Sequence, residues 1–283
     1  MRLVWALRND DLMMIQDQVR DILAQGPQYV VISCEALSRL GPAQIVRLRQ
    51  LLGAAPVRVV YYVRRWPERL PSLWQETVKF GHTDTLPEFL VEHLTRTDQS
   101  ELRDASVIDR FSAVFGAPQV KVVCYSHLID QNIDIANHFL ASFLDLHDIA
   151  LPAPTHPNRS LPRLDTEMIR ILNAIHARHG GERSPALREW YLANKEGLLL
   201  DTILDTVRNS LSTLRLDEAA QPFVSASQEI PIRYASSLVP PWHPDTLHEP
   251  RAIDVPYFRQ DYLFDPTMPK ILDDIHRMYL RIL

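Results

Sequence analysis

The sequence predicts an α/β fold, in which a mainly parallel sheet carries helices on both faces and a largely helical C-terminal part follows. The first observation is three apolar runs rich in β-branched residues, at 28–34 (QYVVISC), 57–63 (VRVVYYV) and 119–125 (QVKVVCY). Such runs are typical of buried parallel strands. The second is the helical spacing of apolar residues between these runs. The third is the change of pattern after residue 150, beyond which no further run of this kind occurs.

The segment between the first two runs, PAQIVRLRQLLGAA, predicts a helix. Its Ile45, Leu48 and Leu52 fall on one helical face, and Gly53 suits a helix end. A strand, a helix and a strand in succession form a unit whose strands are parallel and whose crossover is right-handed. The opening residues, 1–24, also have helical spacing.

Helices are also expected around the third run. Pro67 suits the first turn of a helix that continues through ERLPSLWQETVKFG and ends at Gly81. In the sequence TLPE, Thr85 and Glu88 form a capping box that starts another helix. Two further amphipathic helices are expected, at 101–116 and 131–145.

A proline-rich stretch divides the chain. Residues 151–162, LPAPTHPNRSLP, contain four prolines and predict a surface connection. We therefore expect an α/β core at 1–150 and a helical and irregular extension, 151–283, packed on that core. Within the extension, helical patterns run from Asp165 to about residue 218, an irregular part follows, and the helix KILDDIHRMYLRIL ends the chain.

Composition limits the class of partner. Thirty Lys and Arg residues against 35 Asp and Glu residues give a formal charge of −5, so the chain as a whole does not suit nucleic acid or an anionic membrane. Cys34 and Cys124 each lie in an apolar run, which favours buried thiols and a reducing compartment. The apolar stretch in MRLVWALRNDD is too short for a signal peptide or a transmembrane segment. A cytoplasmic protein is expected.

The candidate site lies where the predicted strands end, because ligands of open α/β sheets bind beyond the carboxyl ends of the strands. Arg64 and Arg65 end the second run, and Ser72 follows Arg64 by eight residues, near the start of the next helix. A guanidinium and a hydroxyl near a helix N-terminus are able to hold one phosphate together. In the alternative interpretation, the arginines are solvated or paired with Glu68, and Ser72 is an ordinary helix serine.

The stretch VRVVYYVRRWPERLPSLWQETVKFG resembles the segment that binds the 3′-phosphate of 3′-phosphoadenosine 5′-phosphosulfate (PAPS) in sulfotransferases. Segments upstream (VVISCEALSRL) and downstream (SVIDRFSAVFGAPQVKVVCYSHL and HPNRSLPRLDTEMIRILN) are similar to successive blocks of bacterial sulfotransferase-like proteins associated with polysaccharides. The resemblance covers roughly residues 28–175.

This resemblance implies a P-loop sulfotransferase-like fold, PAPS as the sulfuryl donor, a carbohydrate or polysaccharide hydroxyl as the acceptor, and no metal. It implies that Arg64 and Ser72, with Arg65 beside them, hold the 3′-phosphate. It also places Asn158, Arg159 and Ser160 near the nucleotide. A proline-rich loop with exposed polar residues explains these three residues equally well.

The resemblance further implies a general base at the end of the strand that precedes the arginine strand, and Glu35 occupies that position. A carboxylate at a partly buried strand end would have the raised pKa that base catalysis near neutral pH needs. Alternatively, Glu35 is the first-turn acid of the next helix. His82 and His127 are the substitute candidates for the base.

One part of the family pattern is missing. Sulfotransferases hold the 5′-phosphosulfate with an N-terminal loop that contains a Lys and small hydroxyl residues, whereas here no Lys precedes Lys79 and the eight glycines form no such loop. Either the chain begins downstream of that loop or it has diverged. Two function classes therefore stay open: a sulfotransferase, or a non-catalytic nucleotide- or glycan-binding relative in polysaccharide assembly. A P-loop kinase would need the same missing loop.

Overall fold

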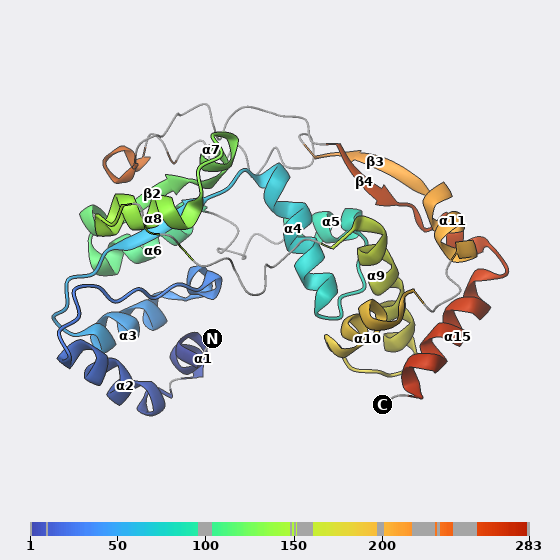
Figure 1. Cartoon of the computed structure of the whole chain (residues 1–283), viewed down its shortest axis with the longest axis horizontal. Helices are drawn as coiled ribbons and strands as arrows, with labels where there is room; N and C mark the ends of the chain where they lie inside the picture. Colours follow the sequence, from blue (N-terminus) through green and yellow to red (C-terminus); the bar gives the residue numbers. More distant parts are fainter. Residues whose placement is uncertain are drawn as a thin grey trace. The chain divides into compact units, whose positions relative to one another are not determined.

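The computed structural model places the chain in two compact units (Figure 1). Unit 1 comprises Met1–Arg65, Thr97–Ala153 and Pro222–Glu249, and unit 2 comprises Trp66–Arg96, Pro154–Gln221 and Pro250–Leu283. Each unit draws on residues from both sides of position 150, whereas the sequence predicts a division there. The structure describes residues 2–9, 11–95, 104–147, 149, 151, 161–196, 201–216, 230, 233–239 and 254–281.

Unit 1 is built around two parallel strands. The register of β1 and β2 pairs Val59 with Val120 at one end and Val63 with Cys124 at the other. This pairing confirms two of the three predicted strands and their parallel direction. The elements of unit 1 are α1 (Arg2–Asn9), α2 (Met13–Ala24), η1 (Glu35–Arg39), α3 (Pro42–Leu52), β1 (Val59–Val63), α6 (Asp104–Phe115), η3 (Ala117–Gln119), β2 (Val120–Cys124), α7 (Tyr125–Asp130), α8 (Ile135–Leu144) and η4 (Ala235–Ser237).

Side chains of β1 and β2 alternate between two apolar clusters, because successive residues of a strand point to opposite faces. On one face, Val63 and Val122 pack with residues of α1, α3 and α6. On the other face, Tyr62 and Val123 pack with Leu128 of α7 and with residues of α8. Helices therefore cover both faces of this strand pair, as the sequence predicts.

The prediction of a strand at 28–34 is wrong. This segment has no ladder partner among the described residues, and the side chains from Tyr29 to Ile32 are 38% to 52% exposed. β-Branched residues favour an extended backbone, but a strand also needs a neighbouring strand with which to exchange hydrogen bonds. The following helix, α3, forms as expected, with Ile45 and Leu48 buried and Gly53 at its C-cap with φ of 59°.

Unit 2 is mainly helical. Its core is one apolar cluster centred on α9, against which α4, α10 and α15 pack. The elements are α4 (Trp66–Lys79), α5 (Leu86–Thr95), α9 (Arg163–Arg178), α10 (Ala186–Asn194), α11 (Asp201–Asn209), β3 (Leu211–Arg215), β4 (Asp254–Phe258), η5 (Gln260–Phe264) and α15 (Met268–Leu280). The last of these confirms the predicted final helix.

One strand pair in unit 2 departs from the prediction. Residues 211–215, expected to continue a helix, form β3, which pairs antiparallel with β4 in the part of the chain expected to be irregular. Their side chains alternate between exposed and half-buried, as in a strand with one covered face. The pairing partner lies about forty residues away, so the helical spacing upstream gave no sign of it.

The predicted capping box is confirmed. The backbone N–H of Thr85 donates to Glu88 Oε2 over 2.8 Å, and the N–H of Glu88 donates to Thr85 Oγ1 over 3.4 Å. The hydrogen bonds from the backbone and hydroxyl of Thr85 lower the pKa of Glu88, because both favour the charged carboxylate. The start of α5 is therefore fixed by its own sequence.

Candidate functional site

The two arginines that follow β1 have different surroundings. The side chain of Arg65 is 6% exposed, and its guanidinium lies 3.1 Å from both carboxylate oxygens of Asp130 at the end of α7. The backbone N–H of Arg65 donates to Ser126 Oγ over 3.0 Å. Since α7 supplies both partners, Arg65 holds the end of β1 against α7. The sequence places Arg65 in the phosphate site, whereas this geometry gives it a structural task.

Arg64 is half-buried, and its guanidinium carbon lies 5.3 Å from the centre of the Tyr125 ring. The parallel register explains the contact. Val63 pairs with Cys124, so Arg64, which follows β1, and Tyr125, which follows β2, lie next to each other. Arginine stacks well on aromatic rings, and its planar set of N–H donors matches the geometry of phosphate and carboxylate. The carboxyl edge of the β1–β2 pair therefore carries a group suited to an anion.

The residues after β2 have mainly structural contacts. Ser126 is fully buried, and its hydroxyl accepts the hydrogen bond from Arg65. His127 is half-buried, and its backbone carbonyl accepts the N–H of Gln131 at the end of α7. Strand-end position alone therefore did not reveal that Ser126 is a packing residue.

Ser72 lies inside α4, directly after Pro71, and is half-buried. The free backbone N–H groups of a helix belong to its first turn. Because α4 begins at Trp66, Ser72 lies beyond that turn. Arg64 belongs to unit 1 and Ser72 to unit 2. Their joint hold on one phosphate stays a prediction.

Glu35 does not end a strand. It is the first residue of η1, a short 3₁₀ helix, and it is exposed. Its backbone carbonyl accepts a hydrogen bond from the hydroxyl of Ser38 over 2.7 Å. This position corresponds to the first-turn acid of the alternative interpretation, and the expected partial burial is absent because residues 28–34 are not part of the sheet.

His82 lies in the loop between α4 and α5 and is half-buried. Burial lowers its pKa, the positive charge of Arg183 lowers it further, and Asp84 and Glu92 oppose these effects. The imidazole is therefore neutral near pH 7 and is able to accept a proton. In the described structure, His82 is better suited chemically to act as a base than the exposed Glu35.

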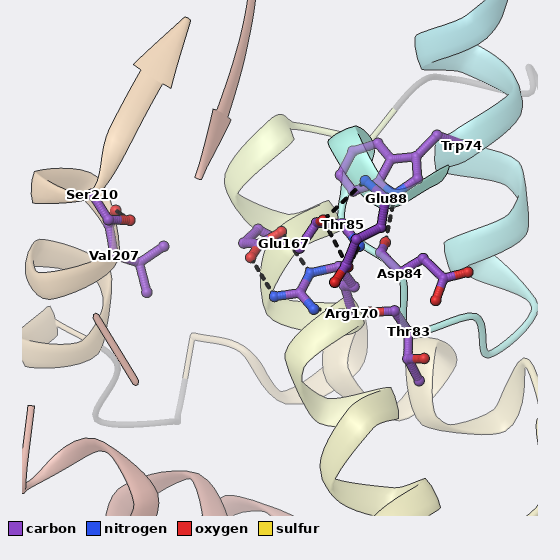
Figure 2. A network of polar contacts seen from close by, with 9 residues as sticks. All are labelled: Trp74, Thr83, Asp84, Thr85, Glu88, Glu167, Arg170, Val207 and Ser210. Atoms are coloured by element: carbon purple, nitrogen blue, oxygen red, sulfur yellow. Dashed lines mark hydrogen bonds and ion pairs between the residues drawn. The ribbon is translucent and has the colours of Figure 1, made fainter. Parts of the chain in front are cut away.

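A buried network fixes the loop that carries His82 (Figure 2). Arg170 of α9 is ion-paired with the buried Glu167, with hydrogen bonds of 2.6 and 2.9 Å, and it also donates to the carbonyl of Thr83 over 2.9 Å. Trp74 Nε1 donates to the carbonyl of Asp84 over 2.8 Å. The loop is therefore held from α9 on one side and from α4 on the other.

Asn173, one turn further along α9, donates from its Nδ2 atom to the carbonyls of Val78 and His82, over 2.9 and 3.0 Å. This polar face of α9 is not among the sites predicted from the sequence. The spacing of Glu167 and Arg170 by three residues is the signal that would have found it, because residues three apart on a helix are neighbours.

Asn158, Arg159 and Ser160 lie outside the described residues. Within the described ranges, the structure holds no group of three or more His, Cys, Asp or Glu side chains arranged to bind a metal ion. None of the helices searched in that part of the chain is long and apolar enough to cross a bilayer.

Comparison with known proteins gives no relative: no protein-family model, no curated protein and no solved structure matches this chain.

Proposed function

We propose that the chain is a sulfotransferase-like protein with a P-loop sulfotransferase-type core, which binds a 3′-phosphorylated adenosine nucleotide of the PAPS type. The supporting observation is the position of Arg64. It follows a parallel strand directly, lies at the carboxyl edge of the β1–β2 pair and stacks on Tyr125. Guanidinium groups hold phosphate through charge-assisted hydrogen bonds, which are stronger than neutral ones. Ser72 is a contact to the 3′-phosphate that only the family resemblance implies.

The proposed reaction is transfer of a sulfuryl group from PAPS to a carbohydrate hydroxyl. The hydroxyl oxygen attacks the sulfur, the bond from sulfur to the 5′-phosphate oxygen breaks, and adenosine 3′,5′-bisphosphate leaves. The hydroxyl proton passes to a base. Glu35 is the base that the family resemblance implies, and His82 is the candidate whose lowered pKa suits the task.

A second candidate is nucleotide or glycan binding without transfer. One observation favours it: Glu35 is exposed at the start of η1, whereas a base for sulfuryl transfer needs a raised pKa, which partial burial would supply. A binding role needs only the 3′-phosphate site.

Calorimetry with two nucleotides tests the binding site. Adenosine 3′,5′-bisphosphate is expected to bind more tightly than adenosine 5′-monophosphate, because only the former has the 3′-phosphate. Arg64→Ala is expected to weaken the bisphosphate by about 2 kcal/mol, or about thirtyfold, the scale of a lost charge-assisted contact.

The matched control is Arg233→Ala. Arg233 also belongs to unit 1 and also stacks on a tyrosine, Tyr234, at 5.5 Å, but it follows no strand of the parallel pair. This variant is expected to bind both nucleotides as the parent does. Equal affinity of the parent for the two nucleotides, or equal losses in the two variants, would count against a 3′-phosphate site.

Transfer is tested separately, with labelled PAPS and a glycan acceptor. Turnover that His82→Gln abolishes and Glu35→Gln leaves intact would assign the base to His82, and the reverse result would assign it to Glu35. Tight binding of the bisphosphate without turnover by the parent would select the binding role.

A further inference from the structure

Three histidines meet between α9 and α15 in unit 2. His176 belongs to α9, His179 is the C-cap residue of α9, and His276 of α15 is 2% exposed. His176 Nδ1 and His276 Nε2 lie 3.0 Å apart, at hydrogen-bond distance. The rings of His179 and His276 are stacked, with centres 5.2 Å apart and planes at 16°. Three titratable rings therefore lie in one helix contact.

The charged and polar groups around this histidine cluster (His176, His179 and His276) come from α15, from the loop after α9 and from η5. From α15, Asp273 lies 3.7 Å from His179 Nε2, and Tyr279 presents its ring to His176 with centres 5.6 Å apart. From the loop after α9, Glu182 and Arg183 line a cavity of about 10 Å³ beside His176. From η5, which also packs on α15, the charged residue is Asp261, and Arg259 pairs with it.

Backbone packing fixes the position of the His176 ring. A Cβ atom built on Gly181 would overlap two ring atoms of His176, so the glycine backbone is packed directly against the imidazole. The N–H of Gly181 also donates to the carbonyl of His176 over 2.9 Å. The ring therefore has little room to turn away from His276.

The contact between His176 and His276 depends on protonation. Two neutral imidazoles, or one neutral and one charged, are able to share an N–H···N hydrogen bond, because one nitrogen still accepts. Once both rings are protonated, every ring nitrogen is a donor and two positive charges face each other in a buried place. Burial lowers the pKa of His276, the neighbouring His176 and His179 lower it further, and Asp273 raises it.

We propose that this histidine cluster is a pH-sensitive latch, which holds α15 on α9 when the rings are neutral and releases α15 when they are protonated. Because the buried ring binds protons less readily in the folded state than in the unfolded state, the latch is fully closed above the ordinary histidine pKa of about 6.5 and weakens as the pH falls below it. Release would expose Leu272, Ile275 and Tyr279, which are buried in the core of unit 2. This device is independent of the proposed nucleotide site.

Hydrogen exchange of the full chain, at about pH 7.5 and about pH 5.5 and corrected for intrinsic exchange rates, tests the latch. Acidification is expected to lower the protection factors of α15 about ten times as much as those of α6. A loss of about tenfold is the effect expected when one buried hydrogen bond is broken. The internal reference, α6, belongs to unit 1 and contains no histidine.

Three variants separate the latch from a general effect of acid. His276→Gln is expected to remove the extra acid sensitivity of α15, and His179→Gln, at a side chain that is 53% exposed, is expected to reduce it without disturbing the core. His147→Gln, at a side chain that is 64% exposed in unit 1, is expected to leave it unchanged. Equal acid sensitivity of α15 and α6 in the parent, or an α15 response in His179→Gln identical to that of the parent, would overturn the proposal.

Discussion

Arg64 in unit 1 and Arg170 in unit 2 show how differently one residue type is used in this chain. Arg170 is 4% exposed, and its guanidinium contacts both carboxylate oxygens of Glu167 and the carbonyl of Thr83. Arg64 is half-buried and stacks on Tyr125 at the edge of the strand pair. Burial with matched polar partners indicates a structural role, while an arginine at a strand end with access to solvent is the candidate for ligand binding.

The largest expected effect comes from breaking the buried pair in unit 2. Glu167→Ala leaves the Arg170 charge buried without its carboxylate, and this is expected to cost about 3–5 kcal/mol of the free energy of unfolding. Urea denaturation measures the loss.

The control for this prediction is Asp205→Ala. Asp205 and Arg208 form an ion pair with the same three-residue spacing, but their side chains are 69% and 60% exposed. Exposed pairs contribute at most about 1 kcal/mol. Equal losses of unfolding free energy in the two variants would show that burial does not distinguish the two ion pairs. Burial would then be no guide to which arginines have a structural role.

A smaller effect is expected at the two neighbouring arginines of unit 1. Arg65→Ala removes the ion pair with Asp130 at the end of α7, which is expected to cost about 1–3 kcal/mol of unfolding free energy. Arg64→Ala removes, among its contacts, the stacking on Tyr125, and this stacking contributes about 0.5–1 kcal/mol.

Nucleotide binding should rank these two substitutions in the opposite order. The Arg64→Ala variant is expected to stay folded and to lose affinity for adenosine 3′,5′-bisphosphate. The Arg65→Ala variant, under conditions in which it is folded, is expected to bind this nucleotide. Denaturation and calorimetry on the same two proteins decide the matter. A larger stability loss in Arg64→Ala would reverse the assignment of roles.

The smallest expected effect is a pH dependence that involves His138 of α8. This residue is 8% exposed, its Nδ1 atom lies 3.3 Å from the Tyr62 hydroxyl, and burial lowers its pKa. Burial also raises the pKa of Tyr62 to about 12, so the phenol stays protonated throughout the acid range. Since the unfolded state binds the proton more readily than the folded state, the stabilisation is complete above about pH 6.5 and falls as the pH decreases.

Denaturation midpoints at several pH values between about 5 and 8 measure this dependence. His138→Phe is expected to make the free energy of unfolding less dependent on pH, because it removes the titrating group and keeps a ring beside Phe143. His147→Gln serves as the exposed control. The quantity to compare is the slope of the free energy of unfolding against pH, and not the absolute stability. An unchanged slope in His138→Phe would show that His138 does not contribute to the pH dependence.

Local signals in the sequence were enough for the elements that depend on them. The capping box of Thr85 and Glu88 starts α5, Gly53 ends α3, and the apolar runs at 57–63 and 119–125 form β1 and β2. Each of these rests on interactions within a few residues or on a continuous run of mainly apolar residues, which is why pattern alone predicted them.

Long-range pairing was decided by the tertiary structure. The run at 28–34 has the composition of a strand but no ladder partner among the described residues, and Glu35 is consequently exposed at the start of η1. Residues 211–215 show the reverse: they follow a helical pattern, but β4 pairs with them and they form a strand. Hydrogen bonding between strands depends on a distant neighbour, which spacing within one segment cannot reveal.

The sequence by itself determined that two arginines follow an apolar strand and that polar residues follow the next one. Only the tertiary structure decided which arginine packs and which faces the strand edge, because Asp130 on α7 reaches Arg65 while the ring of Tyr125 lies beside Arg64. It also decided that histidines about a hundred positions apart, His176 and His276, share one hydrogen bond. Charge and hydrogen-bond capacity are properties of each residue type, whereas burial and partners depend on how the elements pack.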